Sequence, residues 1–96
     1  MMVLVSYDVN TETPAGRKRL RRVARICENH GQRVQNSVFE CLLDPAQFAH
    51  LKSELVGEVN TDTDSLRFYF MGAHWRNRVE HIGAKPSYYP EGPLIV

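Results

Sequence analysis

The sequence predicts an α+β fold, in which strands and helices alternate around one hydrophobic core. Short apolar runs bounded by loop residues are typical of strands, and between them lie two segments whose apolar residues recur at helical spacing. The chain has 96 residues, which is enough for one modest core, and its charged fraction of 24% is ordinary for a globular domain. We therefore expect a single domain over residues 1–96.

The first strand is predicted over residues 2–9, where Met2 to Tyr7 form a nearly continuous apolar run. Such a run is typical of a central strand that is covered on at least one face. Asp8 interrupts the run at the end of the strand. A carboxylate is costly to bury unless it is paired, hydrogen-bonded or bound to a metal, so Asp8 is a candidate for chemistry. A carboxylate that only caps a nearby backbone turn explains the position equally well.

A helix is expected from Pro14 to about Asn29, with Thr13 as its N-cap. Its apolar residues recur at i, i+3, i+4 and i+7, namely Leu20, Val23, Ala24 and Cys27. Off this stripe lie six of the chain's twelve basic residues: Arg17, Lys18, Arg19, Arg21, Arg22 and Arg25. Cations in the first half of a helix oppose its dipole. We interpret them as contacts for nucleic-acid phosphates, although a solvated helix face is the commoner meaning of such a run.

Strand residues return over residues 32–43, with a break at Asn36-Ser37. The break is either a bulge in one long strand or a tight turn between two short strands. A second helix begins at Asp44-Pro45, which provide an N-cap and a first-turn proline, and is expected to end at Gly57. A further strand is predicted over residues 65–71. If the break is a turn, the order is βαββαβ, a ferredoxin-like sheet with helices on one face.

The secondary structure of the C-terminal part of the chain is less clearly predicted by the sequence. Residues 76–81 form either a short strand or a helical turn, and residues 82–93 are expected to be loop. The chain closes with the branched apolar residues Leu94-Ile95-Val96, which are typical of an extra strand added to a sheet edge. That edge belongs either to another subunit or to the same domain.

The remaining chemistry-bearing residues indicate no second site. Cys27 and Cys41 have no metal-binding spacing, so we expect two buried free thiols. The histidines show no H-x-x-x-H or H-E spacing, and the sequence therefore predicts no zinc site. These histidines are His30, His50, His74 and His81. Because the chain has no long apolar segment and its apolar start lacks a basic leader, we expect a cytoplasmic protein that does not bind membranes.

Asp8 alone is a poor magnesium site, because Mg²⁺ prefers octahedral oxygen ligands that usually include one or two carboxylates. No other acidic residue lies close to Asp8 in the sequence. In a homodimer whose twofold axis passes near the end of the first strand, two copies of Asp8 can share one Mg²⁺ or Mn²⁺ ion. Such an ion can activate water and neutralise the charge of a phosphodiester transition state.

Two stretches resemble the CRISPR-associated protein 2 family, the small subunit of the spacer-acquisition machinery. They are Val5-Ser6-Tyr7-Asp8-Val9 and Gly31-Gln32-Arg33-Val34-Gln35-Asn36-Ser37-Val38-Phe39-Glu40. The segment from Glu80 to Pro86 resembles the subtype tied to type I-C systems. The resemblance covers essentially the whole chain. It implies a ferredoxin-like homodimer whose first-strand aspartates meet at the interface, with the segment from about residue 82 to 96 packing on the partner subunit.

The resemblance also implies roles for single residues. Asp8 corresponds to the metal-binding and catalytic aspartate, and Tyr7 is its neighbour in the family. Arg33, Ser37 and Phe39 match positions that the family associates with substrate or the active cleft. The basic residues of the first helix would contribute phosphate contacts, and none of them is assigned individually.

Two functional hypotheses follow. In the first, the protein is a metal-dependent endonuclease that hydrolyses RNA or duplex DNA during spacer acquisition, with Asp8 as the catalytic residue. In the second, the dimer is a non-catalytic adaptor that bridges integrase subunits and holds the protospacer duplex. A monomer would instead favour a plain RNA-binding or toxin-like module, because a shared metal site needs two chains.

Overall fold

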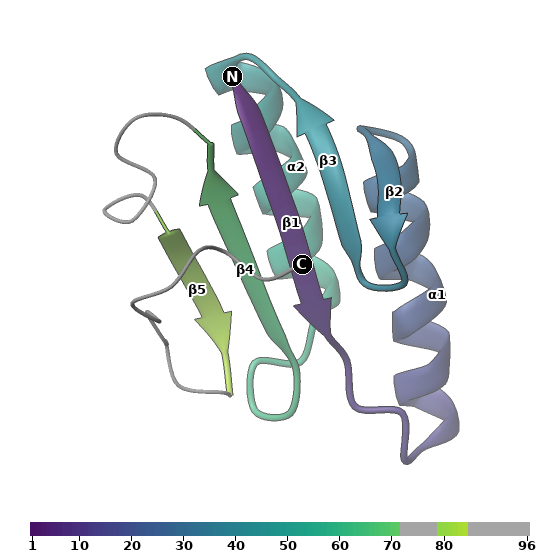
Figure 1. The fold of residues 1–96 in the computed structure, drawn as a ribbon. Coiled ribbons are helices and arrows are strands. Elements are labelled where there is room, and N and C mark those ends of the chain that lie inside the picture. Colours follow the sequence, from purple (N-terminus) through teal and green to yellow (C-terminus); the bar gives the residue numbers. More distant parts are fainter. Residues whose placement is uncertain (72–78, 85–96) are drawn as a thin grey trace, which may run out of the picture.

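The computed structural model describes residues 1–71 and 79–84, whose elements follow the predicted order (Figure 1). These elements are β1 (Met2–Asp8), α1 (Pro14–Glu28), β2 (Gln32–Gln35), β3 (Val38–Leu42), α2 (Pro45–Glu58), β4 (Ser65–Phe70) and β5 (Val79–Gly83). The predicted α+β class and the βαββαβ order are therefore confirmed, and β5 follows as a further strand.

The strands form one sheet in the order β2-β3-β1-β4-β5, and each neighbouring pair is antiparallel. β1 lies at the centre, as its continuous apolar run predicts, and both helices cover the same face of the sheet (Figure 1). The first four strands and two helices thus have the ferredoxin-like arrangement, and β5 extends the sheet beyond β4.

Both helices begin where the sequence predicts. The Thr13 hydroxyl accepts a hydrogen bond from the Gly16 amide at 3.0 Å. Asp44 and Gln47 form a reciprocal capping box, in which each side chain accepts a hydrogen bond from the other residue's backbone amide, at 2.7 and 2.9 Å. The expected end of α2 at Gly57 is wrong by one residue, because the Val59 amide still donates to the Leu55 carbonyl at 3.1 Å and closes the last turn.

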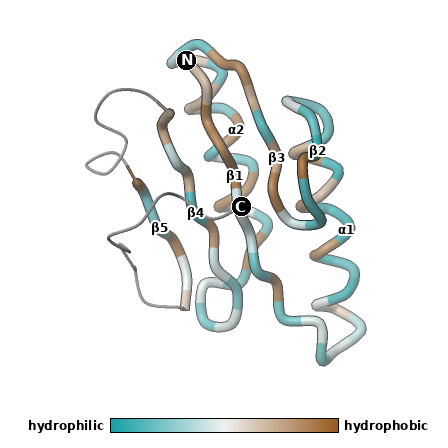
Figure 2. The backbone as a smooth tube through the Cα atoms, viewed as in Figure 1, coloured by the Kyte–Doolittle hydropathy of each residue, from teal (hydrophilic) through white to brown (hydrophobic). Residues whose placement is uncertain are grey.

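The hydrophobic core lies between the sheet and the helices. Alternate residues of β1 enter it, namely Val3, Val5 and Tyr7. The helical stripes predicted from the sequence meet them there, and Val23, Cys27, Leu51 and Leu55 are all fully buried. In Figure 2 the hydrophobic colour follows the central strands, whereas α1 is mostly hydrophilic. Both cysteines are buried free thiols, as predicted.

Asn36 and Ser37 form a two-residue turn between β2 and β3, which decides between the two alternatives that the sequence leaves open. The pairing of these strands also shifts register between Arg33 and Gln35. The Ser37 carbonyl accepts a hydrogen bond from the Tyr7 amide at 3.1 Å, so the turn is fastened to the end of the central strand.

The prediction of loop over residues 82–93 is wrong at its start. Ile82 and Gly83 belong to β5, where they pair with Leu66 and Ser65 of β4. Gly83 has φ of 126°, and a side chain there would meet the Asp64 carbonyl oxygen, so the close approach of these two backbones requires glycine. The predicted strand at residues 94–96, with the rest of segment 85–96, lies outside the described residues.

Candidate functional site

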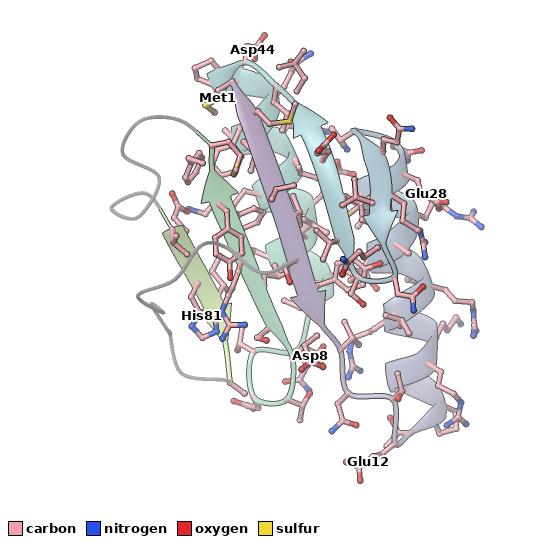
Figure 3. The ribbon with its side chains drawn as sticks, viewed as in Figure 1. Met1, Asp8, Glu12, Glu28, Asp44 and His81 are labelled. Carbon is pink, nitrogen blue, oxygen red and sulfur yellow. The ribbon has the colours of Figure 1, made fainter. Side chains whose placement is uncertain are left out.

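Asp8 is the last residue of β1, and its side chain is exposed (Figure 3). Neighbouring residues of a strand point to opposite faces, and Tyr7 points into the core on the helix side, with 4% of its surface exposed. Asp8 therefore belongs to the opposite face of the sheet, where its cross-strand partner is Ser65. The predicted opposition of Tyr7 and Asp8 is confirmed, and the Asp8 carboxylate is accessible to a ligand.

Beside the end of β1, the predicted cleft residues gather around the β2–β3 turn. The rings of Tyr7 and Phe39 stack with centroids 6.1 Å apart, and the Arg33 guanidinium lies 5.0 Å from the centroid of the Phe39 ring. Arg33 also donates a hydrogen bond to the Asn36 carbonyl at 3.2 Å. The Ser37 carbonyl accepts the hydrogen bond from the Tyr7 amide described above. The structure therefore brings together four residues that the resemblance singles out, namely Tyr7, Arg33, Ser37 and Phe39.

The members of this cluster differ in what they offer to a substrate. Phe39 is fully buried and Tyr7 nearly so, whereas Arg33 is exposed. Burial raises the pKa of the Tyr7 phenol, with a smaller contribution from Cys27, so the phenol stays protonated at neutral pH. The two aromatic rings therefore support the end of β1 by packing. Arg33 presents its charge on the helix side of the sheet, the face opposite to that of Asp8.

A buried aspartate that sequence reasoning missed holds the loops around this end of the sheet. The Asp64 side chain is fully buried and accepts four hydrogen bonds. The donors are the Asn10 amide at 2.9 Å, the Asn60 amide at 2.9 Å, the Thr63 hydroxyl at 3.1 Å and Arg19 Nε at 3.0 Å. Burial alone would raise the pKa of Asp64, but the donors together hold it below its ordinary value.

Asp64 thus joins the loop after β1, helix α1 and the loop before β4. In the sequence it is one of two similar acids in the run Asn60-Thr61-Asp62-Thr63-Asp64. The available signal in the sequence was its place directly before an apolar strand, whereas Asp8 ends one.

The basic residues of α1 divide into two groups. Four of them line a surface hollow of about 280 Å³: Lys18, Arg21, Arg22 and Arg25. We call these four residues the cationic hollow. Arg22 also approaches Glu58 of α2 at 3.4 Å.

The other two basic residues have partners away from the hollow. Arg17 donates to the Thr11 carbonyl at 3.1 Å. Arg19, with 19% of its side chain exposed, is held by Asp64. Four of the six basic residues predicted to contact phosphate therefore lie together. Arg19 instead forms an ion pair with Asp64 inside the protein.

One chain does not gather enough donors for a metal around Asp8. Within residues 1–71 and 79–84, no group of three or more histidine, cysteine or acidic side chains includes Asp8. The exposed carboxylate supplies the oxygen donors that Mg²⁺ prefers, but the remaining ligands must come from water, substrate or a second chain. Neither described helix is long and apolar enough to cross a membrane.

Comparison with known proteins agrees with this fold. The family model described as "CRISPR associated protein Cas2" matches residues 1–79. The "CRISPR-associated endoribonuclease Cas2" of Nitratidesulfovibrio vulgaris is 62% identical over 96 residues, which cover 100% of this chain and 94% of that protein. The "CRISPR-associated endonuclease Cas2" of Halalkalibacterium halodurans is 55% identical over 95 residues, covering 99% of each chain.

A solved structure is also similar. The crystal structure of Streptococcus pyogenes Cas2 at pH 6.5 superposes with a TM-score of 0.71 and 61% sequence identity, over 86% of this chain and 100% of that chain. The family match, the identities and the shared fold lead to one conclusion. The chain belongs to the CRISPR-associated protein Cas2 family.

Proposed function

We propose that this protein is a homodimeric, metal-dependent endonuclease of CRISPR spacer acquisition, with Asp8 of each chain as the catalytic residue. The observation that carries the proposal is the exposed Asp8 carboxylate at the end of a central strand, on the sheet face that the helices leave uncovered. The names of the relatives, endoribonuclease and endonuclease, agree with hydrolysis of RNA or duplex DNA. The resemblance of its tail favours the type I-C subtype.

The proposed metal site needs two chains, because one chain contributes a single carboxylate there. Two Asp8 side chains facing each other across a twofold axis would hold one Mg²⁺ or Mn²⁺ ion. When bound, the ion would supply activation of water and charge neutralisation at the scissile phosphate. The chain's own contribution is to hold Asp8 in place. Tyr7, the residue directly before Asp8, packs on Phe39. The β2–β3 turn is hydrogen-bonded to the same end of β1.

Phosphate binding is the second part of the proposal. Arg33 lies exposed near the same end of the sheet as Asp8 but on the helix side, opposite to the Asp8 face. It is oriented by the Phe39 ring and the Asn36 carbonyl, which suits it to contact a nucleic-acid phosphate outside the Asp8 site. The cationic hollow on α1 would bind the backbone farther along the nucleic acid. Contacts of this kind depend on charge and not on base sequence.

A second function is favoured by the cationic hollow itself. Its four basic residues lie on α1, whereas Asp8 ends β1, so a duplex can be held without cleavage. In this alternative the dimer is an adaptor that bridges integrase subunits and holds the protospacer duplex, and Asp8 serves the dimer interface. The two functions do not exclude each other.

The test is cleavage of a labelled DNA duplex and a labelled RNA by the purified protein, with Mg²⁺ and with EDTA. We expect Asp8→Ala and EDTA each to lower the cleavage rate by more than about 100-fold, because no other group replaces the lost carboxylate. Asp62→Ala is the matched control, since Asp62 is an exposed acid in the α2–β4 loop outside the proposed site.

Light scattering of the same samples reports the oligomeric state, and we expect a dimer. Cleavage that persists in Asp8→Ala, or that is absent in the wild type, would move the assignment to the adaptor. A monomer would contradict the shared site, because a single chain offers no second carboxylate at that position.

A further inference from the structure

Three side chains, one from the turn after α1 and two from α2, lie close together in the helix layer. His30 follows the end of α1, and His50 and Glu54 lie one turn apart on α2. Glu54 Oε1 is 3.3 Å from His50 Nε2 and 3.6 Å from His30 Nε2. One ligand atom from each of the three residues lies within 4.8 Å of the other two. The arrangement is local to this cluster and does not involve Asp8.

The His30 ring is held in one orientation. Its Nδ1 lies 2.9 Å from the Ile26 carbonyl oxygen, which can only accept a hydrogen bond, so Nδ1 carries the proton. In the neutral ring this leaves the lone pair of Nε2 directed to Glu54. A histidine that donates from one nitrogen to a backbone carbonyl and offers the other to a metal is the usual arrangement around protein-bound zinc.

The Glu54 oxygen has no hydrogen bond that accounts for its position. Oε1 is buried, and no group of the described chain donates to it with hydrogen-bond geometry. The Glu54 side chain as a whole is 37% exposed, so only this oxygen is withdrawn from water, and a bound cation would give it a partner. The two imidazole nitrogens lie next to it. A protonated imidazole would pair with this oxygen, and a neutral one offers a lone pair that a cation can use.

Two of the three distances between ligand atoms are close to those of a tetrahedral ion, and the two histidine nitrogens lie within 4.8 Å of each other. With metal–ligand bonds of about 2.0–2.1 Å, two ligand atoms of a tetrahedral site are about 3.3–3.4 Å apart. The two nitrogen–oxygen distances of 3.3 and 3.6 Å lie close to this value. The His30 and His50 rings are tilted by 48° with centroids 5.9 Å apart.

We propose that His30, His50 and Glu54 bind one Zn²⁺ ion on the helix layer. Two imidazoles and a carboxylate suit zinc better than magnesium, which prefers oxygen ligands alone. The three ligands leave a fourth position for water or for a donor from another molecule. The ion would join the turn after α1 to the middle of α2, and it would stabilise the packing of the two helices.

The histidine spacing in the sequence predicts no zinc site, because His30 and His50 belong to different elements and are brought together by packing. The remaining signal, a histidine and a glutamate four residues apart on α2, is too common to predict a metal. This site also differs from the proposed Asp8 site in place and in ligand type, so either can fail without the other.

The experiment is titration of the metal-free, full-length protein with Zn²⁺ against a competing chromophoric chelator. We expect one zinc ion per chain, and we expect His50→Gln and Glu54→Gln each to weaken binding by more than about 100-fold. His50 is the safer of the two variants, since 71% of its side chain is exposed. Glu58→Gln is the matched control, because Glu58 is an acid of the same helix outside the cluster.

Two further readouts complete the test. Co²⁺ in place of zinc should give the visible absorption of a tetrahedral ion, which Glu54→Gln abolishes. Zinc at 100 times its Kd should raise Tm by about 10 °C or more in the wild type and in Asp8→Ala, but not in His50→Gln. Equal zinc affinity in the wild type and both ligand variants, less than one ion per chain, or loss of binding in Asp8→Ala would each overturn the proposal.

Discussion

Arg19 of α1 and Asp64 of the loop before β4 form an ion pair, with Nε and Oδ2 3.0 Å apart and the Asp64 side chain fully buried. The pair connects residues 45 positions apart in the chain. Because two backbone amides and a hydroxyl also donate to the same carboxylate, its charge is compensated inside the protein. Arg19 therefore differs from the four basic residues of α1 that line the cationic hollow.

Replacing Asp64 should destabilise the whole domain. Asp64→Ala removes four hydrogen bonds and leaves donors of three segments without their acceptor, so we expect the free energy of unfolding to fall by about 3 kcal/mol or more. Urea unfolding measures this change. Asp62→Ala, an exposed acid of the same loop, should stay within about 0.5 kcal/mol of the wild type. Equal stabilities of the two variants would contradict a structural role for Asp64.

The same residue predicts how stability depends on pH. Its pKa is lower in the folded chain than in the unfolded chain, where an aspartate has a pKa of about 3.9. Its contribution is therefore complete above about pH 5 and is lost as the pH falls through the lower, folded-state pKa. Unfolding free energies measured from pH 6 downward should fall more steeply in the wild type than in Asp64→Asn. Parallel curves would show that other carboxylates cause the acid destabilisation.

The cationic hollow should determine the salt dependence of duplex binding. Each phosphate contact contributes about 0.9 to the slope of log K against log salt concentration. We expect the double change Arg21→Gln and Arg25→Gln to reduce that slope by about 1 to 2, measured by fluorescence anisotropy. Lys52→Gln is the control, because Lys52 lies on α2 and is paired with Glu80 at 2.6 Å. An unchanged slope in the double variant would place the phosphate contacts elsewhere.

The two thiols should be unreactive in the folded protein. Burial raises the pKa of Cys27 to about 12, with a smaller effect of Cys41, and raises that of Cys41 to about 11. At pH 8 only about 1 in 10,000 Cys27 side chains is then in the reactive thiolate form. Labelling with a thiol reagent should be slow without denaturant and rapid in urea, with both cysteines modified. Fast labelling of the native protein would mean that the core opens locally.

The order of the elements was predictable because it depends on local patterns. The apolar run of β1, the helical stripe that includes Val23 and Cys27, and the caps at Thr13 and Asp44 each act within a few residues. The end of α2 was misplaced by one residue because a glycine stops a helix only if its conformation changes there. The sequence left a strand open for residues 76–81 and predicted loop from residue 82. The end of β5 was missed because the pairing of Ile82 with Leu66 depends on the edge of a sheet formed by other segments.

The candidate site divides in the same way. The alternation of Tyr7 and Asp8 follows from strand geometry, and the sequence alone predicts which of the two is buried. The stacking of Arg33 on Phe39 depends on the turn at Asn36-Ser37, whose alternatives the sequence left open. Nothing local distinguishes Asp64 from Asp62, because the donors that compensate its charge come from three segments.

By itself the sequence determined the α+β class, the strand that carries Asp8 and the family, because each rests on residues that are neighbours in the chain. Tertiary structure alone decided which charged groups meet. It joined Arg19 to Asp64 and brought His30 to His50 and Glu54. His30 and Arg19 are tens of residues from these partners, and the packing of the elements on one another selects the contacts.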